Sequence, residues 1–265
     1  MRDEFDLPEA AARHAQVRRV QPGDELRLFC GRGHEHVAQV LQMGRKAVSV
    51  RVGAAWPALP EMPQRLTLAL GMPANERMDT LVEKATELGV HAIQPLECER
   101  SVLRLSGERA QRKREHWQAV AVAASEQCGR AWVPQVGEVQ PLAVWLQGLA
   151  PTDADAGLST ARLVLSFSAD AHSPSSVVRG MASMDAEEAT PAAGRTGVAG
   201  ADPAPGVPGS WLHAVLALSG PEGGLSPVEE AAARAAGFRP VTLGPRVLRA
   251  DTAPLALLAW WGLRS

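Results

Sequence analysis

Two loops near the C-terminus combine glycine and proline with charged residues, a composition that suits ligand binding. The sequence Gly-Pro-Glu-Gly-Gly occupies 220–224 after an apolar run at 211–218, and Leu-Gly-Pro-Arg-Val-Leu occupies 243–248 at the end of a short predicted strand. In an open α/β sheet, ligands bind in the crevice beyond the carboxyl ends of the strands. Glycine lets the backbone approach a ligand closely, so that exposed N–H and C=O groups can read an adenine edge. The pair of loops predicts such a pocket, whereas each loop alone is equally consistent with a tight turn.

The second loop leads directly into Arg249, Asp251 and Thr252 at the start of a predicted helix. A guanidinium presents a fixed fork of donors that suits a phosphate or a developing oxyanion. Asp251 and Thr252 either cap the helix or orient Arg249 or a substrate base. The sequence leaves both alternatives open.

The sequence lacks the motifs of other nucleotide-dependent enzymes and of metal-dependent enzymes. A Rossmann-type oxidoreductase needs G-x-G-x-x-G after its first strand, but Gly-Met-Pro stands at 71–73, and the chain has no G-x-x-x-x-G-K-[ST] loop of a P-loop ATPase. His34 and His36 lie in a glycine-rich turn without a third ligand, so we expect no metal site.

The cysteines and the apolar runs bear on the compartment. Cys30, Cys98 and Cys128 form no C-x-x-C pair, which argues against a disulfide framework or a zinc knuckle. The longest apolar runs, at 120–124 and 255–261, are too short to span a membrane, and the charged N-terminus lacks the apolar core of a signal peptide. We therefore expect a cytoplasmic protein without a membrane partner.

The N-terminal 60 residues read as short strands. Runs at 25–29, 36–41 and 47–52 are separated by glycine-containing turns, which predicts a small barrel or meander. Three prolines between 57 and 63 then mark a linker.

From residue 65 onward, strands alternate with helices. Strand candidates lie at 66–70, 90–96, 162–167, 211–218 and 240–243. Helices are expected from an N-cap at Asn75 to Gly89, at 106–128, at 141–149, from a capping box at 226–229 to Gly237, and from Asp251 or Thr252 onward, the last burying Leu255, Leu258 and Trp261. This alternation predicts a mostly parallel sheet with helices on its faces.

Residues 169–210 interrupt the alternation. They are rich in Ala, Gly, Pro and Ser without sustained periodicity, so we interpret them as a flexible surface insertion. Residues 150–210 carry seven acidic and three basic residues, which leaves the rest of the chain slightly basic although its net charge is −2. A basic run at 100–114 suits RNA phosphates, or is merely a solvated helix face.

The motifs in both parts of the chain resemble those of a known family. The loops at 220–225 and 243–249 are similar to the paired C-terminal motifs of the RsmE family, the 16S ribosomal RNA (uridine-N3)-methyltransferases of the SPOUT superfamily. Supporting matches are Lys-Ala-Thr-Glu-Leu-Gly-Val at 84–90, Glu-Arg-Ser at 99–101 and Ser-Glu-Gln-Cys-Gly-Arg at 125–130. The N-terminal match over 12–24 is weaker, and the resemblance covers nearly the whole chain except 169–210.

The resemblance implies a fold and a set of partners. It implies an α/β fold, in which residues 61–265 form a SPOUT-type, mostly parallel sheet with a C-terminal trefoil knot, preceded by a small PUA-like β-barrel RNA-binding domain at 1–60. Knots are rare exceptions to the rule against threaded loops, so patterns alone do not predict one. S-adenosylmethionine is the implied cofactor. A homodimer and 16S ribosomal RNA in the small ribosomal subunit are the implied partners.

The resemblance also assigns residues. The implied cofactor site comprises Leu165, Ser166, Gly220, Pro221, Glu222, Gly223, Gly224, Leu243, Gly244, Arg246, Val247, Leu248 and Thr252. Arg249 would face the target uridine, with Arg19, Arg100 and Arg130 on the RNA side. The family usually has Glu where Asp251 stands, so a carboxylate acting there is shorter by one methylene.

A mechanistic hypothesis follows from the chemistry of uracil. N3 bears a proton and is a poor nucleophile until that proton is lost, and the resulting anion spreads its charge onto O2 and O4. We predict that Arg249 stabilises this charge, and that Asp251 either orients Arg249 or relays the proton, with bulk water as the alternative acceptor. Alignment of N3 with the breaking S–methyl bond can supply a large part of the rate.

Two alternatives retain part of this interpretation. A non-catalytic RNA-binding protein would use the barrel and the basic run without any methyl donor. A SPOUT methyltransferase acting on tRNA or on another ribosomal position would share the fold and differ in substrate.

Overall fold

The computed structural model describes residues 4–45, 47–74, 76–149, 159–179 and 212–263. The chain divides into two compact units. The first comprises Met1–Glu61 with Ser125–Val133, and the second comprises Met62–Ala124 with Pro134–Ser265. The first unit thus includes a short later segment that a single boundary at residue 61 does not anticipate.

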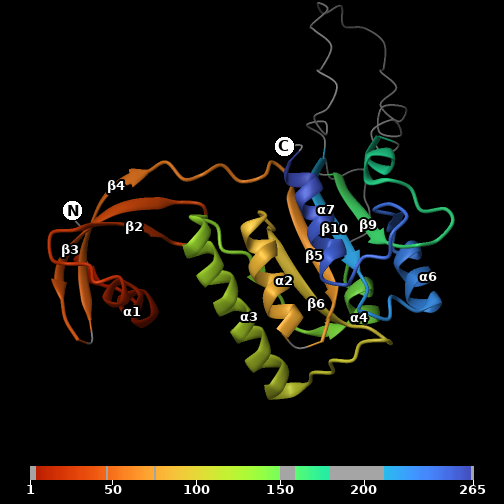
Figure 1. The fold of residues 1–265 in the computed structure, drawn as a ribbon, viewed down its shortest axis with the longest axis horizontal. Coiled ribbons are helices and arrows are strands. Elements are labelled where there is room, and N and C mark those ends of the chain that lie inside the picture. Colours follow the sequence, from red (N-terminus) through yellow and green to blue (C-terminus); the bar gives the residue numbers. More distant parts are fainter. Residues whose placement is uncertain (1–3, 46, 75, 150–158, 180–211, 264–265) are drawn as a thin grey trace, which may run out of the picture. The chain divides into compact units, whose positions relative to one another are not determined.

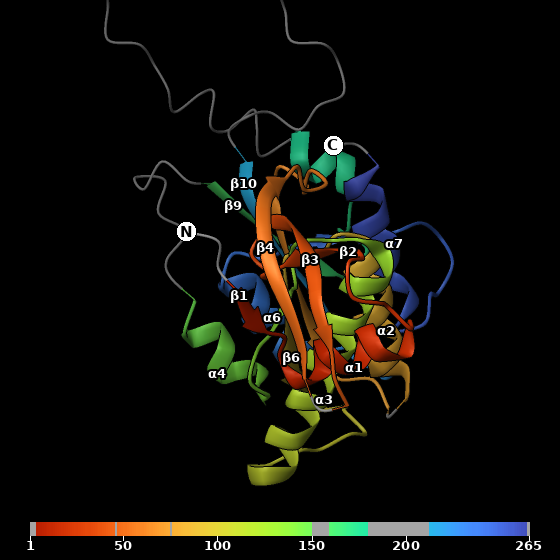
Figure 2. The same ribbon diagram turned by 90° about the vertical axis from the view of Figure 1, so that its left-hand side faces the viewer.

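The first unit contains a four-stranded antiparallel sheet in the order β1-β4-β3-β2. Its elements are β1 (Glu4–Asp6), α1 (Glu9–Val17), β2 (Glu25–Phe29), β3 (Glu35–Met43) and β4 (Val48–Trp56). Figure 2 shows β3 and β4 side by side. Ala12 and Ala15 of α1 pack with Val40 and Val48 in the core of this unit. This helix was not predicted, because the first 60 residues were interpreted as short strands.

The second unit is built on a seven-stranded sheet in the order β11-β9-β10-β5-β6-β7, with β8 also paired to β6, and every pairing is parallel. The strands are β5 (Arg65–Gly71), β6 (Ala92–Glu97), β7 (Gln135–Val136), β8 (Gln140–Pro141), β9 (Ser159–Leu165), β10 (Leu212–Ser219) and β11 (Arg239–Val241). The predicted mostly parallel α/β sheet is therefore confirmed. The trefoil knot in the C-terminal segment stays a prediction.

Helices cover both faces of this sheet (Figure 1). They are α2 (Glu76–Glu87), α3 (Gly107–Cys128), α4 (Leu142–Gln147), α6 (Pro227–Ala235) and α7 (Thr252–Gly262). One residue from each of four neighbouring strands, namely Ala69, Leu96, Val164 and Leu218, packs with α4 and α6 in a single apolar cluster. The helices α2 and α7 contact each other, and Figure 1 shows them together on the other side of the sheet.

The start and end of α6 follow their sequence signals. Ser226 caps the helix, since its hydroxyl accepts from Glu229 N–H while the Glu229 carboxylate accepts from Ser226 N–H, and Pro227 occupies the first helical position. Gly237, just beyond the helix, has a φ of 85°, the left-handed conformation that favours glycine after a helix. The predicted capping box is confirmed.

Other predictions need correction. Residues 169–179, assigned above to a flexible insertion, are ordered: the stretch 174–179 is helical, and Val177 and Val178 are buried. The remainder of that insertion and Asn75, the expected N-cap of α2, lie outside the described residues. Leu255 is only half-buried, because α7 instead buries Pro254 and Leu257 beside the expected Leu258 and Trp261.

Candidate functional site

A pocket of about 430 Å³ opens at the carboxyl ends of β9, β10 and β11. These three strands are neighbours in the sheet, with β9 in the middle, and end at Leu165, Ser219 and Val241. Because parallel strands all end at one edge, the loops that follow them meet there. The glycine–proline loops at 220–224 and 243–248, separated in the sequence by residues 225–242, therefore line the same cavity.

Most of the sequence-predicted cofactor residues line this pocket. They are Leu165, Ser166, Gly220, Pro221, Glu222, Gly223, Gly224, Leu243, Arg246, Val247 and Leu248. Gly244 and Thr252 are not among the lining residues. Both are exposed, and Thr252 is the first residue of α7.

Several other residues that line the pocket were not predicted from the sequence. They are Phe167, Ser168, Ser219, Leu225, Glu230, Val241, Thr242, Ala250 and Ala253. Most of them directly flank the predicted segments, so the motifs underestimate the length of each wall. Glu230 is different, because it enters the pocket from the first turns of α6.

The loop at 220–224 is closely packed against its surroundings. A Cβ atom on Gly220 would come 2.7 Å from the backbone nitrogen of Leu225, and one on Gly223 would come 3.0 Å from Arg100 Cβ. The loop also closes on itself, because Gly224 N–H donates to the Pro221 carbonyl at 2.8 Å. Glycine is therefore required by space at 220 as well as by conformation at Gly224, whose φ is 68°.

Two polar contacts fix the loop from outside. Arg100 Nη1 donates to the carbonyl oxygen of Gly223 at 2.9 Å and approaches that of Leu225 at 3.4 Å. Glu222 Oε1 accepts from Ala74 N–H at 3.0 Å and from Arg77 Nη1 at 3.3 Å. Arg100, assigned above to the RNA side, thus forms part of the pocket wall.

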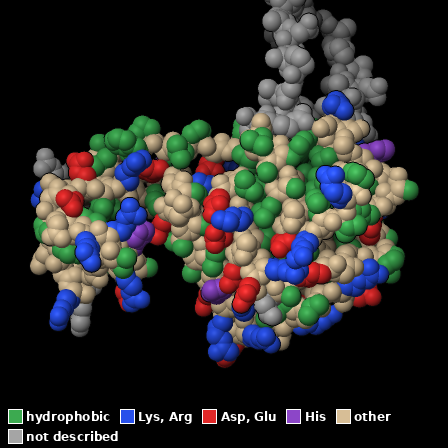
Figure 3. All heavy atoms as spheres, viewed as in Figure 1, with side chains coloured by type: hydrophobic (Ala, Val, Ile, Leu, Met, Phe, Trp, Pro, Cys, Tyr) green, Lys and Arg blue, Asp and Glu red, His purple; other side chains and the backbone are tan. Residues whose placement is uncertain are grey.

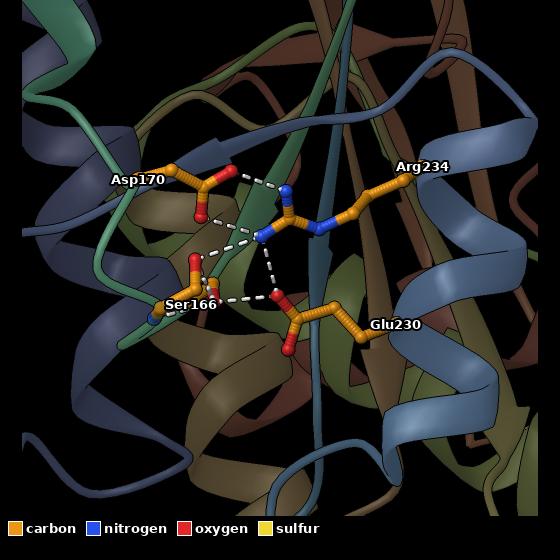
Figure 4. Close-up of polar contacts among 5 residues, drawn as sticks. Ser166, Asp170, Glu230 and Arg234 are labelled. Atoms are coloured by element: carbon orange, nitrogen blue, oxygen red, sulfur yellow. Dashed lines mark hydrogen bonds and ion pairs between the residues drawn. The ribbon is translucent and has the colours of Figure 1, made fainter.

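Three residues of the pocket wall, Ser166, Ser168 and Glu230, belong to a hydrogen-bonded cluster at the end of β9 (Figure 4). Arg234 of α6 donates to both oxygens of Asp170, at 2.6 and 3.0 Å, and to Oε1 of Glu230 at 3.0 Å. Ser166 Oγ lies 2.7 Å from the same Glu230 oxygen. The hydrogen bonds from the Arg234 guanidinium hold the pKa of Asp170 well below its usual range. The spacing of Glu230 and Arg234 on one helix was the only sequence signal for this cluster.

Arg249 lies at the edge of the pocket. Its side chain is exposed, and its neighbours Leu248 and Ala250 line the cavity. The Arg249 carbonyl accepts from Thr252 N–H and from Ala253 N–H, both at 3.0 Å, which fixes the backbone at the start of α7.

Asp251 does not hold Arg249. Its Oδ1 accepts from Thr252 Oγ1 at 3.3 Å, and within the described residues no hydrogen bond or ion pair joins its carboxylate to the Arg249 side chain. Within the described residues, neither the Asp251 side chain nor the Thr252 side chain caps the N-terminus of α7. The alternative in which Asp251 orients Arg249 therefore has no contact to support it.

The remaining two predicted RNA-side arginines belong to the first unit. Arg19 is exposed, with a φ of 55° in the left-handed region. Arg130 is buried, and its Nε donates to Glu61 Oε1 at 3.1 Å while Nη2 pairs with Oε2. The donors of this buried guanidinium are engaged by Glu61 within the protein, which favours a structural role, and the assignment of Arg130 to RNA stays a prediction.

The described residues also bear on two other classes of site. No helix in them is long and apolar enough to cross a membrane. No group of three or more His, Cys, Asp or Glu side chains there is arranged to hold a metal ion.

Comparison with known proteins gives consistent matches along the chain. The model of an RNA methyltransferase domain matches residues 60–191 and 201–262, and that of an RNA methyltransferase PUA domain matches residues 7–53. Ribosomal RNA small subunit methyltransferase E from Mycobacterium tuberculosis is 32% identical over 249 residues, which is 94% of this chain and 82% of the relative. The protein of the same name from Bacillus subtilis is 28% identical over 247 residues, or 92% of this chain and 83% of the relative.

A solved structure extends the likeness to the fold. The crystal structure of ribosomal RNA small subunit methyltransferase E from Neisseria gonorrhoeae, bound to S-adenosylmethionine, superposes with a TM-score of 0.77 at 30% identity. The match covers 98% of this chain and 91% of that chain.

Proposed function

Because the chain belongs to the ribosomal RNA small subunit methyltransferase E family, we propose that it transfers a methyl group from S-adenosylmethionine to N3 of a uridine in 16S ribosomal RNA. The meeting of the loops at 220–224 and 243–248 in one pocket is the observation that carries this proposal.

The residues of the pocket fit this cofactor. The volume of about 430 Å³ lies in the range of small-molecule sites. Two glycine-containing loops bring backbone donors and acceptors to the cavity for the adenine, while Arg100 and Arg246 supply positive charge for the carboxylate of the methionine part. When bound, S-adenosylmethionine supplies an electrophilic methyl group on a sulfonium.

Arg249 is the residue we assign to the uridine. Methylation of N3 requires that the N3 proton be lost, which places negative charge on O2 and O4 of the ring. The Arg249 guanidinium is exposed at the pocket edge, where its donors can reach those oxygens as the charge develops. Within the described residues it has no hydrogen-bond or ion-pair partner of its own, so its donors are available.

The N3 proton is accepted by Asp251 or by water, and not by Arg249. Asp251 is partly exposed and only weakly engaged by Thr252, so its carboxylate can take up a proton and pass it to solvent. Uracil N3–H is a mildly acidic imide, and water is the alternative acceptor. This division of roles leaves charge stabilisation to Arg249 and proton transfer to Asp251 or water.

RNA binding is assigned to the PUA-like unit and to the start of α3. Figure 3 shows Lys and Arg side chains over the N-terminal end of α3, interspersed with acidic ones. Arg109 and Arg112 are exposed there, as Arg19 is in the first unit. We include in the proposal a cytoplasmic homodimer that acts on RNA of the small ribosomal subunit.

The proposal is tested by binding and by product mapping. Calorimetry should show binding of S-adenosylmethionine by the purified protein, which a pure RNA-binding module would not show. Incubation with unmethylated 16S ribosomal RNA, naked and in small subunits, should then yield one N3-methyluridine, located by primer extension arrest. Methylation of tRNA instead, or of another base, would overturn the substrate assignment.

A further inference from the structure

The cluster in Figure 4 places a carboxylate in the pocket with a defined hydrogen-bonding state. Ser168 N–H donates to Ser166 Oγ at 3.0 Å. The Ser166 hydroxyl has two acceptors within reach, Ser168 Oγ at 3.0 Å and Glu230 Oε1 at 2.7 Å, and the shorter contact is the one to the carboxylate. Arg234 Nη2 donates to the same Oε1 at 3.0 Å and to Ser168 Oγ at 2.8 Å. Both lone-pair directions of Oε1 are therefore occupied.

The second oxygen of Glu230 is in the opposite state. Within the described residues, Oε2 has no hydrogen-bond or ion-pair partner. A carboxylate oxygen has about two acceptor directions, and Glu230 lines the pocket with its side chain 26% exposed. The site therefore offers two acceptor positions from one rigidly held oxygen.

Resting on the function proposed above, we propose that Glu230 recognises the vicinal ribose hydroxyls of the methyl donor, and that Arg234 is the positioning residue that aims it. A ribose carries two adjacent O–H donors, which matches the two acceptor positions of Oε2. Carboxylates fill this role for the ribose in other nucleotide-binding α/β proteins.

The positive charge of Arg234, next to Glu230, disfavours binding of the ammonium or sulfonium group of the methyl donor at Glu230. An ammonium or sulfonium on Oε2 would lie a few ångströms from the Arg234 guanidinium, which is only 3.0 Å from the other carboxylate oxygen. Like charges at such a separation repel, whereas a neutral diol pays no such penalty. Asp170 cannot offset this repulsion fully, because its side chain is 63% exposed and screened by water.

The decisive measurement is calorimetry with three nucleosides. Glu230→Gln keeps the shape of the side chain and removes its charge, and Glu230→Ala serves as a second variant, with circular dichroism to establish folding. S-adenosylhomocysteine and 5′-methylthioadenosine share the ribose, but only the first has an amino-acid part; the third probe is a dideoxy form of S-adenosylhomocysteine. Glu83→Gln, which removes an exposed carboxylate outside the pocket, is the matched control.

The expected result is a loss of about tenfold in affinity for both hydroxyl-bearing nucleosides in Glu230→Gln, and almost none for the dideoxy probe. Unchanged binding of 5′-methylthioadenosine would overturn the inference in favour of ammonium recognition. An equal loss for the dideoxy probe would overturn it in favour of a general structural effect. If the wild-type protein bound none of the three, the proposed function itself would fail, which is a distinguishable outcome.

A double-mutant cycle tests the role of Arg234. If Arg234 acts by aiming Glu230, then Arg234→Ala should weaken S-adenosylhomocysteine about as much as Glu230→Gln, and the double variant should lose little more. Arg234→Lys, which keeps the charge without the planar fork, should restore part of the affinity. Additive losses would show that Arg234 acts independently of Glu230 and would overturn its assignment.

Discussion

Pro221 lies directly against Gly71: a Cβ atom built on Gly71 would come 2.5 Å from Pro221 Cδ and 2.6 Å from its backbone nitrogen. The end of β5 and the loop after β10 therefore share one tightly packed position. Since Pro221 lines the pocket, the shape of the pocket depends on a residue that does not line it.

Gly71→Ala should consequently distort the pocket, although Gly71 itself does not line it. The added methyl group must displace Pro221, and overpacking of this kind typically costs about 1–3 kcal/mol. We expect a lower melting temperature and an affinity for S-adenosylmethionine reduced at least about tenfold, by calorimetry. Gly148→Ala is the control, because its nearest neighbours would lie 3.6 Å away. Equal behaviour of the two variants would contradict the packing argument.

Arg249→Ala should separate chemistry from cofactor binding. Loss of a donor to developing negative charge typically lowers kcat by about 100-fold to 1000-fold. Single-turnover methylation should slow by that order, while the Kd of S-adenosylmethionine stays near the wild-type value. Arg65→Ala, at the exposed start of β5, is the control for removal of a surface arginine. A normal methylation rate in Arg249→Ala would remove this residue from the mechanism.

Arg100→Ala should weaken the cofactor even without RNA. Its guanidinium holds two carbonyl groups of the pocket loop, so its loss frees that loop. We expect the Kd of S-adenosylmethionine to rise about tenfold in calorimetry of the protein alone. Arg109→Ala, exposed on α3, should leave this Kd unchanged and raise only the KM for RNA, more so at low salt. If both variants changed only the KM for RNA and left the Kd of S-adenosylmethionine unaltered, Arg100 would belong to the RNA side, as first predicted.

Cys98 should be the slowest thiol to react. Burial, with the nearby Glu229 charge, raises the pKa of Cys98 to about 12, so the reactive thiolate is nearly absent at neutral pH. In timed alkylation of the native protein, exposed Cys30 should label first and Cys98 only after unfolding.

The same shift predicts a pH dependence of stability. The unfolded chain releases the Cys98 proton above about pH 9 whereas the folded chain retains it, so the stabilisation is present below pH 9 and lost as pH rises toward 12. The stability gap between wild type and Cys98→Ala should shrink by about 1 kcal/mol per pH unit in that window, measured by urea unfolding. A gap that did not vary with pH would contradict the shift.

Arg130→Ala should act on stability, not on RNA. Removal of the guanidinium leaves the Glu61 carboxylate, 34% exposed, without its partner. We expect a loss of about 2 kcal/mol in the free energy of unfolding, below the cost for a fully buried pair because water reaches Glu61. Arg13→Ala, whose pair with Glu9 is exposed on both sides, should cost under about 1 kcal/mol. A selective loss of RNA affinity at full stability would contradict this assignment.

Local signals explain which parts of the fold were predictable. Ser226, Pro227 and Glu229 determine the start of α6 within four residues, and apolar runs locate the central strands because parallel strands are buried on both faces. Each of the two glycine–proline loops is a continuous stretch of sequence, so both motifs could be recognised without the structure.

Long-range pairing explains what was missed. Asp170 lies 64 residues from Arg234, in a stretch without apolar periodicity, so no local signal indicated that the two side chains pair. Arg130 reads as a solvent-facing charge until Glu61, 69 residues away, is placed beside it. Which side chains pair across such sequence separations depends on the packing of the folded sheet. It cannot be predicted from the residues next to either partner in the sequence.

The direction of β10 has a practical consequence. The strand enters the sheet at Leu212 and reaches the pocket only at Ser219, so its whole length separates the chemistry from the junction with residues 180–211. A fluorescent reporter or an affinity handle joined next to Leu212 would therefore lie at the opposite end of this strand from the pocket.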